Sequence, residues 1–355
     1  MTSRVTPRLV YERWTDPVAG QALASSPIDL IKLDLAADAA QGWLSLEAAH
    51  GYQVATRTDV AGVPQGSQWL AGAELVARCP DLLAVCSAGA GYDVIDVDAC
   101  TRAGIAVCNN SGPGAEAVAE HALGFMLDLA KKMTLSDRVL RRGDLGDRLA
   151  LQGSELLGKT VGIVGMGAIG RRLVELCAPF KMDVLVYDPY LDDATATQCG
   201  VGRVGLTELL ERSDFVQLNC PLTAETEGLI GRAEFASMKR TAFFITTARG
   251  RVHDEVALYD ALASGQLAGA GIDVFHEEPP RSDHPLLTLD NVVASPHTAG
   301  ITAEAARHIA FATAAQWQAI FEGKPPPRLI NRDVWPRYCD RFDGFFGFRP
   351  SADAL

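Results

Sequence analysis

KTVGIVGMGAIGRRLVELCAPFKMDVLVYD, residues 159–188, is the stretch that decides the fold. It opens as an apolar, β-branched run and breaks at Gly165-Met166-Gly167-Ala168-Ile169-Gly170. A helix-compatible segment follows, and a second apolar run, residues 184–187, ends at Asp188. The order strand, glycine turn, helix, strand and terminal carboxylate is typical of a dinucleotide-binding βαβ unit.

The glycines and the acid each have a predicted task. Gly165 permits the tight turn, Gly167 lets the backbone approach a pyrophosphate, and Gly170 lets the helix pack close to the strand. The helix N-terminus offers free N–H groups to the anion. Asp188 is placed to accept hydrogen bonds from the adenosine ribose. Because a carboxylate there repels the extra phosphate of NADP, the predicted cofactor is NAD.

Composition limits the possible functions. The chain has 355 residues, enough for about two domains, and 48% of them are hydrophobic. The net charge of −12 argues against nucleic-acid or anionic-membrane partners, because both need a basic surface. We therefore expect a globular protein without a nucleic-acid or membrane partner.

The cysteines and the apolar runs indicate the compartment. The eight cysteines form no CxxC pair and have no metal-ligand spacing, so we expect reduced thiols and no metal site. No apolar run approaches eighteen residues, and the first residues lack the apolar core of a signal peptide. We expect a cytoplasmic protein.

Strand candidates alternate with helical segments along most of the chain, as in α/β proteins. Five precede the glycine turn, at residues 8–12, 28–34, 52–57, 82–87 and 105–108. Four follow Asp188, at residues 214–219, 242–247, 268–275 and 292–295. With the opening βαβ unit the second set makes six strands, the number of a doubly wound dinucleotide domain.

The predicted domain order follows from this alternation. Residues 1–110 form the first part of a substrate-binding domain, and residues 111–301 form the NAD-binding Rossmann domain, which begins with a long helix from Ala115 to about Met133. Residues 302–355 supply a return helix and a tail that complete the substrate domain. Within the long helix, His121 is interpreted as a polar residue on a helix face.

Two places in the first domain invite a chemical interpretation. The small-residue turn at residues 87–91 follows a strand, and its consecutive N–H groups suit an anion-binding concavity, although a plain strand-to-helix turn fits equally well. Arg57 ends the preceding strand and is a candidate for a second anionic group.

Polar residues follow three late strands, at the edge where open α/β sheets bind ligands. The stretches are Thr247-Ala248-Arg249-Gly250, Asp273-Val274-Phe275-His276-Glu277-Glu278-Pro279 and Ser295-Pro296-His297-Thr298. Arg249 can bind a substrate carboxylate in bidentate fashion. His297 can take the alcohol proton as hydride leaves, and Glu278 can orient the imidazole. These residues predict hydride transfer to or from a 2-hydroxy acid.

Several motifs together resemble the D-isomer-specific 2-hydroxyacid dehydrogenases, which are NAD-dependent. Besides the glycine turn and the three late stretches, they are Gly89-Ala90-Gly91-Tyr92-Asp93, Ala117-Val118-Ala119-Glu120, Gly158-Lys159-Thr160-Val161-Gly162, Cys220-Pro221-Leu222-Thr223 and Pro296-His297-Thr298-Ala299-Gly300. The resemblance covers almost the whole chain. It implies a Rossmann cofactor domain inserted into a flavodoxin-like α/β substrate domain, usually in a homodimer.

The resemblance also implies roles for individual residues. Arg249, Glu278 and His297 become the catalytic set, and Asp273 becomes a partner of the nicotinamide carboxamide. The N–H groups near Ala88 and Gly89 bind the substrate carboxylate. The remaining residues assigned to the cofactor are Gly165, Gly167, Ala168, Ile169, Gly170, Asp188, Cys220, Pro221, Thr247, Ala248, His297 and Gly300.

Three functions stay open. The leading hypothesis is a D-2-hydroxyacid dehydrogenase acting on hydroxypyruvate, glyoxylate or a similar small acid. A short-form D-3-phosphoglycerate dehydrogenase, with Arg57 on the phosphate, is the alternative among enzymes. An NAD(H)-sensing binding protein like the co-repressors that share this fold is the alternative of another class.

Overall fold

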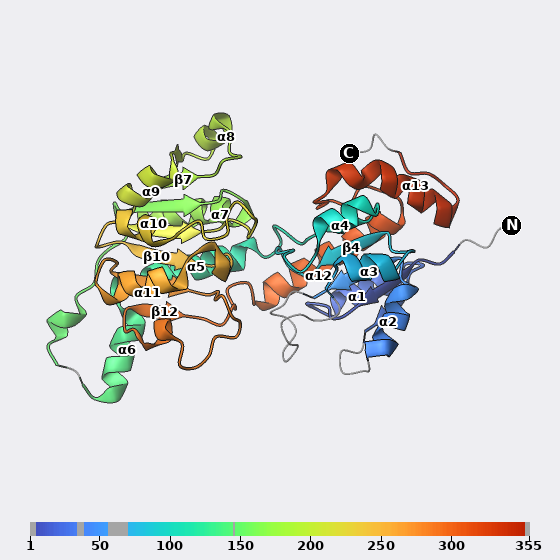
Figure 1. The fold of residues 1–355 in the computed structure, drawn as a ribbon. Helices are drawn as coiled ribbons and strands as arrows, with labels where there is room; N and C mark the ends of the chain where they lie inside the picture. The colour runs from blue at the N-terminus through green and yellow to red at the C-terminus, as the bar shows by residue number, and fades with distance from the viewer. Residues whose placement is uncertain (1–4, 34–38, 56–69, 145, 352–355) are drawn as a thin grey trace. The chain divides into compact units, whose positions relative to one another are not determined.

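The computed structural model describes residues 5–33, 39–55, 70–144 and 146–351. The chain divides into two compact units (Figure 1). Unit 1 consists of Met1–Gly114 and Thr302–Leu355, and unit 2 is Ala115–Ile301. Unit 2 is therefore inserted between the two segments of unit 1. The first structural boundary falls four residues after the predicted one, because Ser111 is still bonded within unit 1, where its carbonyl accepts from Arg328 Nε at 2.8 Å.

Unit 2 contains a fully parallel sheet of seven strands in the order β12-β11-β10-β9-β6-β7-β8. The strands are β6 (Thr160–Val164), β7 (Asp183–Tyr187), β8 (Gly202–Arg203), β9 (Phe215–Leu218), β10 (Phe243–Thr246), β11 (Gly269–Ile272) and β12 (Val292–Ala294). The order reverses between β6 and β9, which is the switch point of a doubly wound sheet. The predicted Rossmann domain is confirmed, with one strand more than the six expected.

Helices cover both faces of this sheet, as the consecutive buried residues of its central strands require. One face packs on α5 (Ala115–Lys131) and α7 (Ala168–Cys177) through residues such as Phe125 and Leu173. The other packs on α9 (Leu206–Arg212), α10 (Arg232–Ser237) and α11 (Glu255–Ala263). Within β10, Phe244 belongs to the second core and Ile245 to the first.

Unit 1 contains a second parallel sheet, in the order β2-β1-β3-β4-β5. Its strands are β1 (Arg8–Tyr11), β2 (Asp29–Lys32), β3 (Gly51–Val54), β4 (Ala84–Ser87) and β5 (Ala106–Cys108). This is the strand order of flavodoxin-like folds, so the predicted class of the second sheet is also confirmed.

The C-terminal segment completes unit 1. Helix α2 (Ala39–Glu47), α3 (Ala73–Arg78) and α4 (Val97–Arg102) lie on one face of the sheet. On the other face α1 (Val18–Ala24), α12 (Ala303–Phe321) and α13 (Trp335–Phe346) pack through buried aromatic residues that include Trp317 and Tyr338. The segment after the triple proline therefore contributes a helix to the core.

Two further details differ from the sequence-based expectation. The long helix α5 ends at Lys131 instead of at about Met133, and a separate helix, α6 (Met133–Arg142), begins almost at once. None of the α6 side chains is buried, and the helix extends away from the rest of unit 2 (Figure 1). Among the described residues, no helix combines the length and the apolar character needed to span a membrane.

Candidate active site

The strand registers align the predicted site residues in one row. Val164 is level with Tyr187 and Leu218, Leu218 with Thr246, Thr246 with Ile272, and Ile272 with Ala294. The residues that come next therefore form a row at the carboxyl edge of the sheet: Gly165, Asp188, Asn219, Thr247, Asp273 and Ser295. Sequence reasoning expected this edge to carry the site, and the geometry brings these positions together.

The glycine turn is built at the switch point. Gly165 has φ +98°, a region that side chains avoid, and a Cβ there would lie 2.9 Å from the backbone nitrogen of Cys220. A Cβ on Gly167 would meet nothing within 4 Å. The backbone thus fits tightly against β9 on one side and faces open space on the other.

The first turn of α7 offers unpaired donors to that space. Gly167 is the N-cap and supplies no side chain, and the first intrahelical bond is made by the amide of Arg171. Among the described residues, no acceptor pairs with the amides of Ala168 and Ile169. Gly170 is buried where the helix meets the strand. Free amides at a helix N-terminus suit a pyrophosphate.

Asp188 follows β7 beside the turn. Its Oδ2 accepts from the amide of Met166 at 2.8 Å, and its Oδ1 accepts from the amide of Tyr190 at 2.9 Å. Each carboxylate oxygen keeps a second lone pair for a ribose hydroxyl. The turn, the free amides and this acid fit a dinucleotide.

A buried glutamine ties together the strand ends beside the turn. Gln217 donates through Nε2 to Asn219 Oδ1 at 3.0 Å and to Thr247 Oγ1 at 2.9 Å. Asn219 Nδ2 is buried and has no partner, so this row keeps an unused donor. Cys220 is buried, which raises the pKa of its thiol to about 11 and keeps it protonated. Pro221 is exposed, and Ala248 is buried.

Asp273 holds the loop after β12. Its carboxylate, 1% exposed, accepts from Ser295 Oγ at 2.5 Å and from the amides of Thr298 and Ala299 at 2.8 and 3.1 Å. Its carbonyl accepts from the amide of His297 at 2.7 Å. Asp273, the predicted partner of the nicotinamide carboxamide, thus holds the loop that carries His297. This loop ends at Gly300, beside Val118.

His297 and Glu278 are in direct contact. His297 Nδ1 lies 2.8 Å from Glu278 Oε2, and both side chains are about one-quarter exposed. Glu278 Oε1 accepts from the amide of Phe275, so the carboxylate is fixed on its own loop. A carboxylate is an acceptor, so Nδ1 carries the proton and Nε2 is the ring atom left for chemistry. His297 itself has φ +56°.

Arg249 follows β10 at the start of a short 3-10 helix, residues Gly250–Val252. Its Nη1 donates to the carbonyl of Ala248 at 2.8 Å. A Cβ on Gly250 would lie 2.1 Å from the backbone of Phe275, so the loop of Arg249 packs directly on the loop of Glu278. Only glycine allows this approach.

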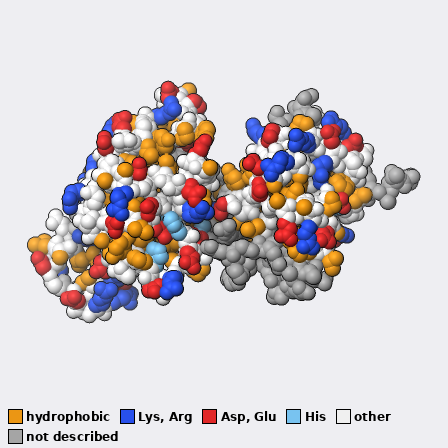
Figure 2. Space-filling view, viewed as in Figure 1, with side chains coloured by type: hydrophobic (Ala, Val, Ile, Leu, Met, Phe, Trp, Pro, Cys, Tyr) orange, Lys and Arg blue, Asp and Glu red, His pale blue; other side chains and the backbone are white. Residues whose placement is uncertain are grey.

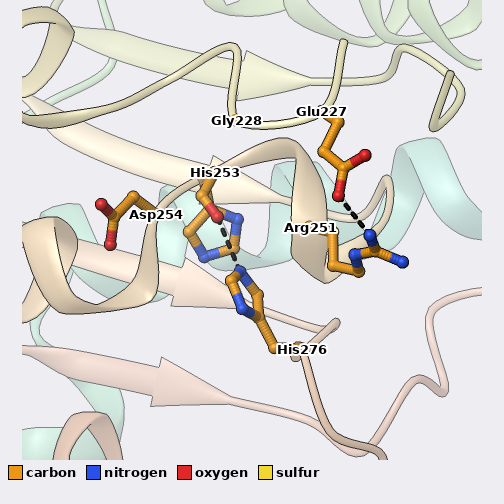
Figure 3. A pocket seen from close by; sticks show the side chains of 6 residues that line it. All are labelled: Glu227, Gly228, Arg251, His253, Asp254 and His276. Carbon is orange, nitrogen blue, oxygen red and sulfur yellow. Dashed lines mark hydrogen bonds and ion pairs between the residues drawn. The ribbon is translucent and has the colours of Figure 1, made fainter. Parts of the chain in front are cut away.

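Two histidines also connect the loop after β10 with the loop after β11. His276 Nε2 contacts the carbonyl of His253 at 2.8 Å (Figure 3), and the amide of His276 donates to Glu255 at 2.7 Å. His253 and His276 border a cavity of about 360 Å³ that Arg251 and Glu227 also line. Histidine side chains are visible together on this unit in Figure 2. The cavity does not include Arg249, Glu278 or His297.

The turn after β4 in unit 1 has its own geometry. Asn109 Nδ2 donates to the carbonyl of Ala90, and Asn110 donates to the carbonyls of Ala88 and Gly89. The amide of Ala88 donates to Val54, so it is not available to a ligand. The amides of residues 89–91 have no acceptor among the described residues. The predicted anion site therefore begins at Gly89.

Three residues that hold the site together were not predicted from the sequence, and one predicted substrate ligand is not tested by the structure. Gln217 and Asn110 are buried polar residues with no motif to mark them. His121 lies four residues from the buried Ala117 and Phe125, and this helical spacing placed it on the inner face of α5. Arg57 lies outside the described residues. In the part of the chain that the structure describes, no group of three ligating side chains could hold a metal ion.

Comparison with known proteins adds a family. Residues 123–299 match the model of the "D-isomer specific 2-hydroxyacid dehydrogenase, NAD binding domain". The chain is 39% identical over 265 residues to D-3-phosphoglycerate dehydrogenase of Archaeoglobus fulgidus, covering 75% of this chain and 50% of that protein. It is 40% identical over 265 residues to glyoxylate reductase of Korarchaeum cryptofilum, covering 74% and 80%. The chain thus spans about half the length of the phosphoglycerate dehydrogenases that it matches.

Solved structures agree over nearly the full length. A glyoxylate reductase from Paecilomyes thermophila superposes with a TM-score of 0.81 at 26% identity, covering 92% of this chain and 98% of that chain. A D-lactate dehydrogenase from Aquifex aeolicus, complexed with NAD and lactic acid, gives 0.77 at 26% identity, covering 91% and 98%.

Proposed function

The chain belongs to the D-isomer-specific 2-hydroxyacid dehydrogenase family, and on that basis we propose that it is an NAD-dependent oxidoreductase. In this proposal it transfers hydride reversibly between NAD(H) and a small 2-hydroxy or 2-keto acid. The observation that carries the proposal is the 2.8 Å contact between His297 Nδ1 and Glu278 Oε2, on the edge of the sheet that also holds the glycine turn.

The cofactor is assigned to the row at the carboxyl edge. The amides of Ala168 and Ile169 would hold the pyrophosphate, and Asp188 the adenosine ribose, which favours NAD over NADP. Bound NAD(H) supplies or accepts the hydride. The unpaired Asn219 donor and the Asp273 loop supply polar groups further along the same row.

His297 handles the proton. Because Glu278 accepts the Nδ1 proton, Nε2 is free to take the hydroxyl proton as a hydroxy acid is oxidised. In reduction the imidazolium returns a proton from Nε2 to the carbonyl oxygen, and the carboxylate of Glu278 stabilises the ring's positive charge. The pair therefore fixes both the tautomer and the orientation of the base.

Two elements are assigned to the substrate carboxylate. The guanidinium of Arg249 follows β10 beside the loop of Glu278 and offers paired N–H donors. In unit 1, the amides of residues 89–91 form the second candidate, with Gly89 as the first available donor. For Ala88, the proposed role is limited to holding the turn.

The substrate is a small 2-keto or 2-hydroxy acid such as glyoxylate or hydroxypyruvate. The chain is about as similar in sequence to a phosphoglycerate dehydrogenase, at 39% identity, as to a glyoxylate reductase, at 40%. This similarity supports a second candidate substrate, 3-phosphoglycerate, with Arg57 as the phosphate ligand. An Arg57→Ala variant that loses discrimination between 3-phosphoglycerate and glycerate would favour it.

The proposal also includes the oligomeric state and the cellular compartment of the protein. A homodimer is supported by α6, which exposes Met133 and Leu140 on a helix without buried side chains. Light scattering should give twice the chain mass, and Leu140→Glu should shift it toward the monomer. All eight cysteines are unpaired, which fits a reducing compartment such as the cytoplasm.

A substrate panel tests the function. Purified protein is mixed with NADH or NADPH and each of glyoxylate, hydroxypyruvate, pyruvate and 3-phosphohydroxypyruvate, and nicotinamide absorbance is followed. We expect turnover with at least one acid and a preference for NADH. Background rates throughout would refute the dehydrogenase proposal, and NADH binding without turnover would favour the sensing protein.

A further inference from the structure

We infer that His121 is a positioning residue for the loop that carries His297, and that it acts through Ser295 and Asp273. The inference rests on the proposed function, because it assigns a role within the same site. It concerns a histidine on α5 that no catalytic motif includes.

The contacts form an unbroken chain. His121 Nε2 lies 2.9 Å from Ser295 Oγ, and Ser295 Oγ lies 2.5 Å from Asp273 Oδ1. The same Asp273 oxygen accepts from the amide of Thr298 at 2.8 Å, and the other oxygen accepts from the amide of Ala299. The chain thus runs from α5 to the residues directly after the imidazole.

The direction of each hydrogen bond follows from proton counting. Ser295 has one hydroxyl proton, and the Asp273 carboxylate can only accept it. The serine oxygen must therefore accept from His121, so the Nε2 of His121 carries a proton. This requirement fixes one tautomer of the neutral ring.

Packing holds the ring in place. His121 lies edge-on to Phe125, with ring centroids 4.6 Å apart and an interplanar angle of 85°. Its Nε2 is 3.9 Å from Asp273 Oδ1, whose carboxylate is almost completely buried. Such a carboxylate depends on its few donors, because water cannot replace a lost one.

These contacts hold the backbone conformation of His297. Its backbone is left-handed, at φ +56°, and its amide donates to the Asp273 carbonyl. A non-glycine residue stays in that region only where surrounding contacts impose it. With the hydroxyl of Ser295 held by His121, Asp273 keeps its oxygens aimed at the two amides after the imidazole. Loss of the His121 donor frees the serine to rotate and loosens the loop.

Matched variants separate this role from simple packing. His121→Phe keeps the ring against Phe125 but lacks the donor, whereas His121→Gln keeps an N–H donor of similar reach. Ser295→Ala removes the middle of the chain. The measurements are kcat and KM with NADH and the best keto acid, the NADH Kd from fluorescence, and Tm.

We expect His121→Phe and Ser295→Ala each to lower kcat about tenfold, and the double variant to lower it no further, since both break one chain. His121→Gln should stay within about twofold of wild type in kcat, with its NADH Kd and Tm unchanged. Equal effects of Phe and Gln, or multiplied effects in the double variant, would overturn the inference. An inactive wild type would instead refute the proposed function.

A spectroscopic measurement does not depend on turnover. In ¹⁵N-histidine NMR of the whole protein, the signal assigned by its loss in His121→Gln should show a protonated Nε2 and an unprotonated Nδ1 near pH 8. A protonated Nδ1 with a bare Nε2 would contradict the chain, whatever the enzyme's activity.

Discussion

The molecule contains two parallel α/β sheets that use their carboxyl edges differently. In unit 2 the loops after the strands carry several ionisable side chains, and Glu278 is in direct contact with His297. In unit 1 the turn after β4 consists of small residues whose carbonyls are pinned by Asn109 and Asn110. The edge in unit 2 presents acids, a base and a cation, whereas the described turn after β4 in unit 1, residues 88–91, presents backbone amides.

Parallel-sheet topology alone therefore does not place catalytic side chains at the carboxyl ends of the strands. Both sheets obey the rule that ligands bind beyond the carboxyl ends of parallel strands. In unit 2 that edge carries His297 and Glu278, which can move a proton, whereas the described turn at residues 88–91 of unit 1 has no ionisable side chain. Chemistry is therefore expected from unit 2, and binding from the turn in unit 1.

The largest effect is expected for the imidazole. His297→Gln keeps a hydrogen-bonding side chain but cannot exchange a proton near neutral pH, so kcat should fall about 10³-fold. The NADH Kd, measured by fluorescence as the control, should change little. A kcat within tenfold of wild type would remove His297 from proton transfer.

Arg249 comes next. Arg249→Ala removes the paired donors for the substrate carboxylate, so KM for the keto acid should rise about 10²-fold with a smaller change in kcat. Arg249→Lys, a point charge without the planar fork, should recover only part of the loss. If KM is unchanged in both variants, the carboxylate is bound elsewhere.

Acid stability probes a different part of unit 2. Burial lowers the pKa of His253 to about 3, whereas the unfolded ring titrates near 6.5. The unfolded chain therefore takes up the proton first, and stability is full above pH 6.5 and falls as pH drops toward 3. Between pH 7 and pH 5 this group costs about 2 kcal/mol.

His253→Leu should lack that loss. Urea unfolding of both proteins at pH 7 and pH 5 measures it, because the free energies of unfolding give the slope directly. Equal losses in wild type and variant between the two pH values would show that His253 does not cause the acid sensitivity.

The glycine turn allows a matched pair. Gly165→Ala forces a Cβ at positive φ against the backbone of Cys220, so both Tm and NADH affinity should fall. Gly167→Ala adds a Cβ to open space, so Tm should hold while the NADH Kd rises about tenfold, since the methyl group blocks approach of the pyrophosphate. Unchanged NADH binding in Gly167→Ala would place the cofactor elsewhere.

The smallest effect belongs to unit 1. Asn109→Ala removes the bond that holds the Ala90 carbonyl, at 2.7 Å, and loosens the turn whose amides are assigned to the substrate. KM should rise about threefold with kcat and NADH Kd unchanged. A loss of kcat larger than that of Arg249→Ala would abolish the division between the two sheets.

Much of this arrangement is readable from the chain. The glycine turn and its flanking apolar runs predicted β6, α7 and β7 almost to the residue, because their periodicity and the Gly165 conformation leave few alternatives. The edge carrying Arg249, Asp273 and His297 was also predictable, since parallel strands end at the same side. Both sheet classes were expected and confirmed.

Other features depend on contacts that no local pattern encodes. Strand β8 has only two residues and exists through pairing with β7. The amide of Ala88 is used by Val54, which only the register of β3 and β4 reveals. His121 looked like a polar residue on a helix face, because its partner Ser295 is far along the sequence.

Product analysis measures whether His297 supplies the proton when a 2-keto acid is reduced. Hydroxypyruvate is reduced with excess NADH by wild type and by His297→Gln, and the glycerate formed is quantified on a chiral column alongside the NADH consumed. We expect one equivalent of D-glycerate per NADH with wild type, and almost none with the variant. NADH consumption without hydroxy acid, formation of the L isomer, or equal yields from both proteins would contradict it.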